Sequence, residues 1–181
     1  SRLEEVLRRI RKLLRDNKET AKRVLEEIER LLREADKRNR EALKEIEKRM
    51  REVEDKLRKA RLPEDVVREL RRRITELLRR LEEITRRSRE RVKEILERLK
   101  EVVERTERKI RKIERELSEI KREKDLEELR RRVKEVSDES RKLLEDLLDE
   151  ARKVLEENRK LVEEILREAK KVIDEIEEKL R

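Results

Sequence analysis

The side chains of this sequence that could take part in chemistry are hydroxyls, carboxylates, amines and guanidinium groups, because His, Cys and Tyr are absent. Ser88 and Ser140 are nucleophiles by type, but a serine hydroxyl reacts only where a neighbouring base removes its proton. Neither serine has such a base at its own level of the helical pattern described below, and imidazole and thiol groups are missing altogether. The sequence therefore predicts no catalytic residue and no enzyme.

Carboxylates are abundant, with 50 Asp and Glu residues, and their oxygens could in principle hold a metal ion. Di-metal centres in helical bundles need Glu side chains that project into the core, normally together with His. No Asp, Glu or Lys occupies the apolar stripe of this sequence, so we expect the carboxylates to be solvated. The sequence thus predicts no metal site and no cofactor, and the lack of Cys excludes disulfides.

Uncharged polar side chains are a second group, and their chemistry is hydrogen bonding. Asn39 lies in the polar stretch LLREADKRNREALKEI, residues 31–46, where it could belong either to a loop or to the inside of a helical core. Apolar residues recur at steps of three and four, and Asn39 stands four residues after Ala35 and three before Ala42. The pattern continues without a change of phase, which predicts an uninterrupted helix with Asn39 facing inward.

Two genuine breaks interrupt the apolar pattern. Pro63 lacks an amide hydrogen and fits the first turn of a new helix, where Glu64 and Asp65 would favour the positive end of the helix dipole. The second break follows Ile120, where a run of charged residues ends at Asp125, a helix-capping residue with Glu128 three positions later. Ser1 and Glu4 repeat this capping pattern at the start of the chain.

The chain is thereby divided into three helices of similar length. It is 60% charged and 33% hydrophobic with no Gly, which is typical of long helices when it accompanies helical periodicity. We expect helices at about 2–61, 64–121 and 126–180, joined by short connections that force neighbours to run antiparallel. The predicted fold is all-α: one domain, residues 1–181, forming an up-down-up three-helix bundle that is nearly straight or weakly left-handed.

The hairpin register collects the uncharged polar residues into two cross-sections of this bundle. A turn near residue 62 places residue i of the first helix near about 124 − i on the second, and a turn near 124 places residue j near about 248 − j on the third. We interpret the two cross-sections as buried hydrogen-bond layers that fix register, because a slip would strand polar groups; the alternative is that some of these hydroxyls bond their own helix. The predicted layer residues are Asn17, Thr20, Asn39, Thr85, Ser88, Thr106, Ser137, Ser140 and Asn158.

Together these features resemble those of de novo designed helical bundles. The resemblance is carried by the capping residues Ser1 and Asp125, the LPED turn, the Leu/Ile/Val core, the Glu/Lys/Arg surface and the two polar layers. More narrowly, the chain is similar to parametrically generated coiled-coil bundles with built-in hydrogen-bond networks, although its turns lack the glycine common in such designs. The resemblance implies a protein with no ligand and no activity.

The formal net charge of +9 raises the possibility of nucleic-acid binding. The charge is unevenly divided: residues 1–62 carry +7, residues 63–122 carry +6 and residues 123–181 carry −4. An acidic third helix between two basic ones favours docking within the bundle. Basic runs alternate with Glu, and no aromatic residue could stack on bases, so we expect no specific nucleic-acid partner.

The leading functional hypothesis is a hyperstable, monomeric scaffold whose polar layers specify helix pairing. Two alternatives remain: a module that self-associates as a homo-oligomer or binds a partner helix, and an apolipoprotein-like amphipathic bundle that opens onto lipid. The closed apolar stripe favours the scaffold, for which we expect no partner and no membrane contact. No apolar run approaches the roughly 20 residues that span a bilayer. A synthetic protein of this kind has no natural location and should be soluble, and cytoplasmic when expressed.

Overall fold

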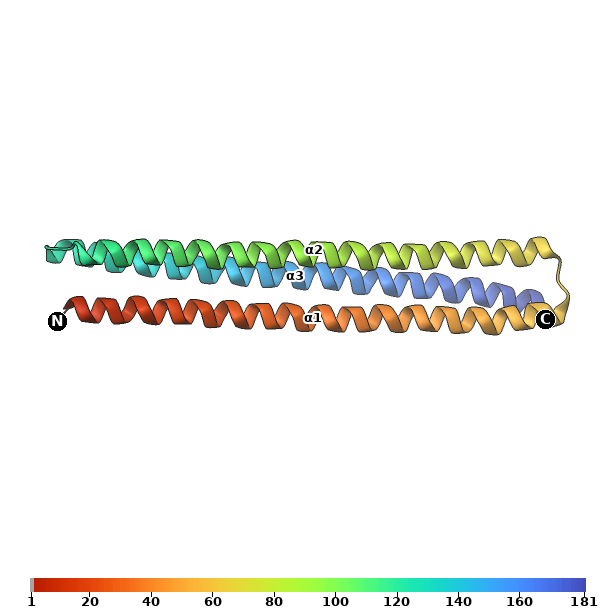
Figure 1. Cartoon of the computed structure of the whole chain (residues 1–181). Coiled ribbons are helices and arrows are strands. Elements are labelled where there is room, and N and C mark those ends of the chain that lie inside the picture. Colours follow the sequence, from red (N-terminus) through yellow and green to blue (C-terminus); the bar gives the residue numbers. More distant parts are fainter. Residues whose placement is uncertain (1) are drawn as a thin grey trace. The chain divides into compact units, whose positions relative to one another are not determined.

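A computed structural model describes residues 2–181. It contains three helices, α1 (Arg2–Ala60), α2 (Glu64–Ser118) and α3 (Glu123–Leu180), and no strand among the described residues (Figure 1). Each pair of helices is joined by side-chain contacts, as in the bonds Arg89–Asp36, Asn158–Ser88 and Ser140–Asn17. The protein is therefore an all-α, up-down-up three-helix bundle, which confirms the fold predicted from the apolar pattern.

The bundle consists of two compact units, and every helix contributes to both. Unit 1 contains the chain up to Arg30 together with Val92–Arg152, and unit 2 contains Leu31–Arg91 and Lys153–Arg181. The core of unit 1 includes Val6, Ile10, Ile110, Ile113, Leu117, Leu126, Leu129 and Val133. The core of unit 2 includes Ala42, Ile46, Val53, Leu57, Leu70, Ile74, Leu77, Leu81, Val162, Ile165, Ala169, Val172, Ile173 and Ile176.

Buried positions recur along each helix at intervals of eighteen residues. On α1, Ile10, Ile28 and Ile46 are spaced in this way, and none of them is more than 2% exposed. Eighteen residues make five turns of a helix with 3.6 residues per turn, so the same face returns to the core without drift. Each helix can therefore remain amphipathic over its full length without supercoiling, whereas a seven-residue repeat would require a left-handed supercoil.

The first connection follows the predicted chemistry. α1 ends at Ala60, and Arg61 takes up the left-handed backbone conformation with φ 51°, at a position where helices commonly end in glycine. The carbonyl of Pro63 accepts hydrogen bonds from the amides of Val66 and Val67 at 3.1 and 3.4 Å. Glu64 and Asp65 lie in the first turn of α2, as the sequence predicts.

The second connection differs from the prediction by three residues at each end. α2 ends at Ser118, whose hydroxyl donates to the carbonyl of Arg115 at 2.6 Å, and α3 already begins at Glu123. Asp125 is therefore a first-turn residue of α3 instead of its cap, because Glu123 and Lys124, which have high helix propensity, start the helix ahead of its first apolar residue, Leu126. The predicted cap at Ser1 lies outside the described residues.

Candidate functional site: buried polar layers and interhelical ion pairs

The predicted layer residues occupy the inward faces of the helices. Thr20 and Thr85 are half-buried, whereas the other seven are buried, with Ser140 and Asn158 each only 1% exposed. Burial of amides and hydroxyls is costly unless they find hydrogen-bond partners, so the bonds that they make decide what these residues do. The buried residues are Asn17, Asn39, Ser88, Thr106, Ser137, Ser140 and Asn158.

In unit 1, the polar layer joins α1 to α3. The hydroxyl of Ser140 donates to the Oδ1 atom of Asn17 at 2.5 Å. Thr106 on α2 and Ser137 on α3 are buried in the same unit. The amide nitrogen of Asn17 is buried without a hydrogen-bond partner among the described residues. The layer therefore holds two helices together through one hydrogen bond and leaves one donor unused.

In unit 2, the polar layer joins α2 to α3. The amide nitrogen of Asn158 donates to the Oγ atom of Ser88 at 3.0 Å, and Ser88 donates its own proton to the carbonyl of Ile84 at 2.9 Å. Thr85 bonds to the carbonyl of Leu81, also at 2.9 Å. The sequence allowed either a bond between helices or a bond within one helix, and Ser88 makes both. Its hydroxyl donates to a carbonyl of its own helix and accepts from Asn158 of α3.

Asn39, on α1, is a further buried polar residue of unit 2. It is 6% exposed, and its Oδ1 atom has no partner among the residues described, as is also true of Oδ1 of Asn158. A buried polar atom left without a partner costs about 1–3 kcal/mol. Asn39 is buried, as the sequence predicts. The expectation that the polar side chains of its layer would all hydrogen-bond to one another is not met, because its carbonyl oxygen has no partner among the described residues. Within residues 2–181, each layer contains one hydrogen bond between helices.

A line of ion pairs joins α2 to α3 in both units, over distances of 2.5 to 4.0 Å. In every pair the two residue numbers total 248, which matches the predicted relation between these helices. In five pairs α2 supplies the cation and α3 the carboxylate, and the sixth pair is reversed. The pairs are Arg73–Glu175, Arg80–Glu168, Arg91–Glu157, Arg98–Glu150, Lys109–Glu139 and Glu116–Arg132.

The contacts between α1 and α2 follow an equally regular register. Lys18 pairs with Glu107, Asp36 with Arg89 and Glu54 with Arg71, and the residue numbers of each pair total 125. The predicted total was about 124, so the hairpin register inferred from the turn was off by a single position. When two helices run antiparallel, the residue numbers of paired positions have a constant sum. This sum is the same within unit 1 and within unit 2.

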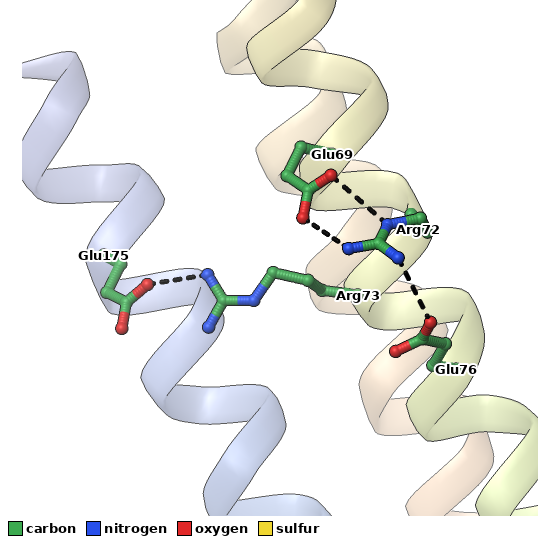
Figure 2. A network of polar contacts seen from close by, with 5 residues as sticks. All are labelled: Glu69, Arg72, Arg73, Glu76 and Glu175. Atoms are coloured by element: carbon green, nitrogen blue, oxygen red, sulfur yellow. Dashed lines mark hydrogen bonds and ion pairs between the residues drawn. The ribbon is translucent and has the colours of Figure 1, made fainter.

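Ion pairs along single helices supplement those between helices. Figure 2 shows Arg72 bound to Glu69 on the preceding turn and to Glu76 on the following turn, at 2.7 and 3.6 Å. The adjacent Arg73 instead reaches across to Glu175 of α3 at 2.8 Å (Figure 2). Neighbouring arginines therefore divide their roles, one supporting its own helix and the next connecting two helices.

The arginines shift the titration of their carboxylate partners. Hydrogen bonding to Arg132 lowers the pKa of Glu116, and hydrogen bonding to Arg73 lowers the pKa of Glu175. Glu27 shows the same effect, since its hydrogen bond with Arg30 lowers its pKa. Glu175 is exposed, whereas Glu27 and Glu116 are half-buried, and ion pairs at such positions near the surface contribute little net stability individually. The pairs between α2 and α3 are notable for the regular register in which they occur and not for the stability that each one adds.

The candidate nucleophiles have no chemical partner that could activate them. Ser140 contacts the amide of Asn17, while Ser88 contacts the amide of Asn158 and a backbone carbonyl, and none of these groups takes up a proton near neutral pH. Among the described residues, no group of three or more Asp and Glu side chains is arranged to hold a metal ion. The hydroxyls of Ser88 and Ser140 are therefore bonded to amide and backbone groups.

Sequence reasoning found polar residues that are buried in the structure, but it did not find the ion pairs. The signal was available, because applying the 248 relation to the charged residues of the last two helices selects Arg73 with Glu175 and Arg98 with Glu150. Comparisons with protein families, curated proteins and solved structures found no match to this chain. Within residues 2–181, every helix is too polar to cross a lipid bilayer.

Proposed function

We propose that this chain is a de novo designed structural scaffold whose task is to fold into one arrangement of three helices. Its buried polar layers and interhelical ion pairs specify which faces meet and in which register. The scaffold acts as a monomer and carries no catalytic or cofactor chemistry of its own.

The observation that carries this proposal is the placement of polar residues at positions that are otherwise apolar. On α3, Ser140, Asn158 and Ile176 are spaced by eighteen residues and are all buried. An apolar side chain fits this helical position, as Ile176 demonstrates, so Ser140 and Asn158 are not there to fill space. Replacing apolar core residues with amides and hydroxyls lowers stability, and the best-attested benefit of such polar residues is a specific helix register.

A shift of register would strand these groups. Sliding α3 by one heptad relative to α1 would bring Val133 or Leu147 to the level of Asn17 in place of Ser140. The Oδ1 atom of Asn17 would then lose its only hydrogen bond among the described residues, at about 1–3 kcal/mol. The slide that brings Val133 to Asn17 would also place Glu145 opposite Glu27, where Arg152 now forms an ion pair. A shift of one heptad in either direction thus costs the buried hydrogen bond of Asn17.

The experiment that tests the proposal compares the parent chain with a variant whose layers are made apolar, Asn17→Val with Ser140→Val and Ser88→Leu with Asn158→Leu. Distances between spin labels on α1 and α3 report the register, and multi-angle light scattering reports the mass. We expect the parent to show one narrow distance distribution at a mass near 22.5 kDa, and the variant to show broader or multiple distributions.

Two results would count against the scaffold proposal. Equally narrow distributions for parent and variant would mean that the layers do not specify register. A mass that is a multiple of 22.5 kDa would favour the self-associating module over the monomer.

A further inference from the structure

A groove with a volume of about 530 Å³ lies between α1 and α3 in unit 1. Its apolar lining comes from Val6, Ile10 and Leu13 on α1 and from Val133 on α3. Small-molecule sites in proteins are mostly apolar hollows of about 300–1,000 Å³ with a few polar groups at their edges. The groove therefore has the size and lining of a ligand site, and none of the predicted layer residues lines it.

One position of the eighteen-residue repeat on α3 changes from leucine to arginine beside this groove. Leu148 and Leu166 occupy equivalent positions on α3, and both are partly buried. The preceding equivalent position holds Arg130, which is exposed and lines the groove. In unit 2, the groove that Leu166 lines between the same two helices has a volume of about 290 Å³. The groove of unit 1, where an arginine takes the place of the leucine, is thus the larger of the two.

The edges of the groove are predominantly basic. Asp16 and Glu127 are the acidic residues in its lining. Arg131 pairs with Glu135 at 3.9 Å, while none of the other four cations has an ion-pair partner among the described residues. The lining therefore carries more cations than carboxylates. The five cations are Arg9, Lys12, Arg130, Arg131 and Lys134.

We propose that this groove binds a single-chain anionic amphiphile, such as a fatty carboxylate. The alkyl chain lies along the half-buried Leu13, which removes apolar surface from water. The carboxylate is held by the rim cations, among which arginine offers paired donors that match its geometry. Negative charge is required of the ligand, because five cations face two carboxylates around the groove.

The length of the groove favours a small molecule over an acidic helix. On α1 it extends from Val6 to Asp16, which corresponds to about 15 Å along the helix axis. A docked helix of that length would have about three turns, which is marginal as an isolated helix in water. An extended alkyl chain, by contrast, needs no such ordering of a backbone and can bury its whole length in a groove of this size.

The test is titration of the full-length protein with monomeric sodium dodecanoate, followed by calorimetry and by the methyl NMR signals of Leu13 and Val133. We expect saturable binding with shifts at both methyl positions. The cation dodecyltrimethylammonium, at the same concentration, should bind at least tenfold more weakly because it meets the same rim with the opposite sign of charge.

Two variants separate the apolar and the charged parts of the site. Arg130→Leu fills the hollow and removes a cation, and should weaken dodecanoate binding at least tenfold. Its matched control is Arg108→Leu, an exposed residue of α2 that makes the same change of charge and side chain. Arg9→Gln with Lys12→Gln keeps the apolar lining and should weaken binding about tenfold.

Several outcomes would overturn the proposal. These are no saturable binding of dodecanoate, equal binding of the cationic amphiphile, or equal affinities for the Arg130→Leu and Arg108→Leu proteins. Association with vesicles of phosphatidylglycerol in the absence of any binding to monomeric dodecanoate would also overturn it, because that result would assign the basic surface to membranes. Circular dichroism on each variant verifies that its helices are intact.

Discussion

Replacing Asn39 by leucine should stabilise the protein, because the native side chain is buried with an unpaired carbonyl oxygen. Removing that oxygen recovers about 1–3 kcal/mol. Burying a leucine in its place contributes about 1.5–3 kcal/mol more. The equivalent positions eighteen residues away on α1 are Ala21 and Leu57, both buried, so a leucine is compatible with this face of the helix.

Overpacking is the effect that could reverse this gain, since extra methylenes in a filled core cost about 1–3 kcal/mol. Asn39 however lines a groove of about 310 Å³ between α1 and α2, together with Leu43 and Thr85. This space can accept the larger side chain, so most of the overpacking cost should be avoided. The net expectation is a stabilisation of about 2–4 kcal/mol.

Guanidinium chloride unfolding followed by circular dichroism measures this change. With a denaturant slope of about 4 kcal/mol per molar, the midpoint should rise by about 0.5–1 M. Arg38→Leu is the matched control, because this neighbouring residue of α1 is exposed and its replacement should change stability by less than about 0.5 kcal/mol. An unchanged or lowered midpoint for Asn39→Leu would refute the reasoning, since it would mean that the amide oxygen is already satisfied in solution.

Three further predictions concern the turn, the ion pairs and the whole fold. Arg61→Gly should stabilise the protein by about 1 kcal/mol because Arg61 has a φ of 51°, whereas Arg58→Gly, inside α1, should destabilise it by about 1 kcal/mol; equal denaturation midpoints for both would contradict this. The carboxyls of Glu27, Glu116 and Glu175 have pKa values below 4.5 in the folded protein, so their stabilising contribution is present above pH 4.5 and is lost as the pH falls through the folded pKa. Denaturant midpoints measured across this acid range should fall, and midpoints independent of pH would show that the pairs contribute nothing. Heating to the boiling point of water should remove little helical circular dichroism, and a cooperative melt at about 45–65 °C, as in mesophile domains, would exclude hyperstability.

The accuracy of sequence reasoning varied with the kind of interaction involved. The helix around Asn39 was predictable because periodicity is a local property that passes through a single polar residue. The start of α3 was not, since the apolar pattern ends at Ile120 and the charged residues after it can form a helix or a loop with similar ease. The bond between Ser140 and Asn17 was predictable in level but not in partner, because several hydroxyls lie close to the same cross-section.

The amino-acid sequence by itself determined the class of fold, the number of helices, the antiparallel register of α2 and α3 and the inward position of the asparagines. These properties follow from the 3.6-residue period of the helix and from the two breaks in the apolar pattern, at Pro63 and after Ile120, which are all local features of the sequence. Only the tertiary structure decided which polar atoms are paired, which remain unpaired and where a groove stays open beside Arg130. Those outcomes depend on how side chains from separate helices share the same space, and no single stretch of sequence contains that information.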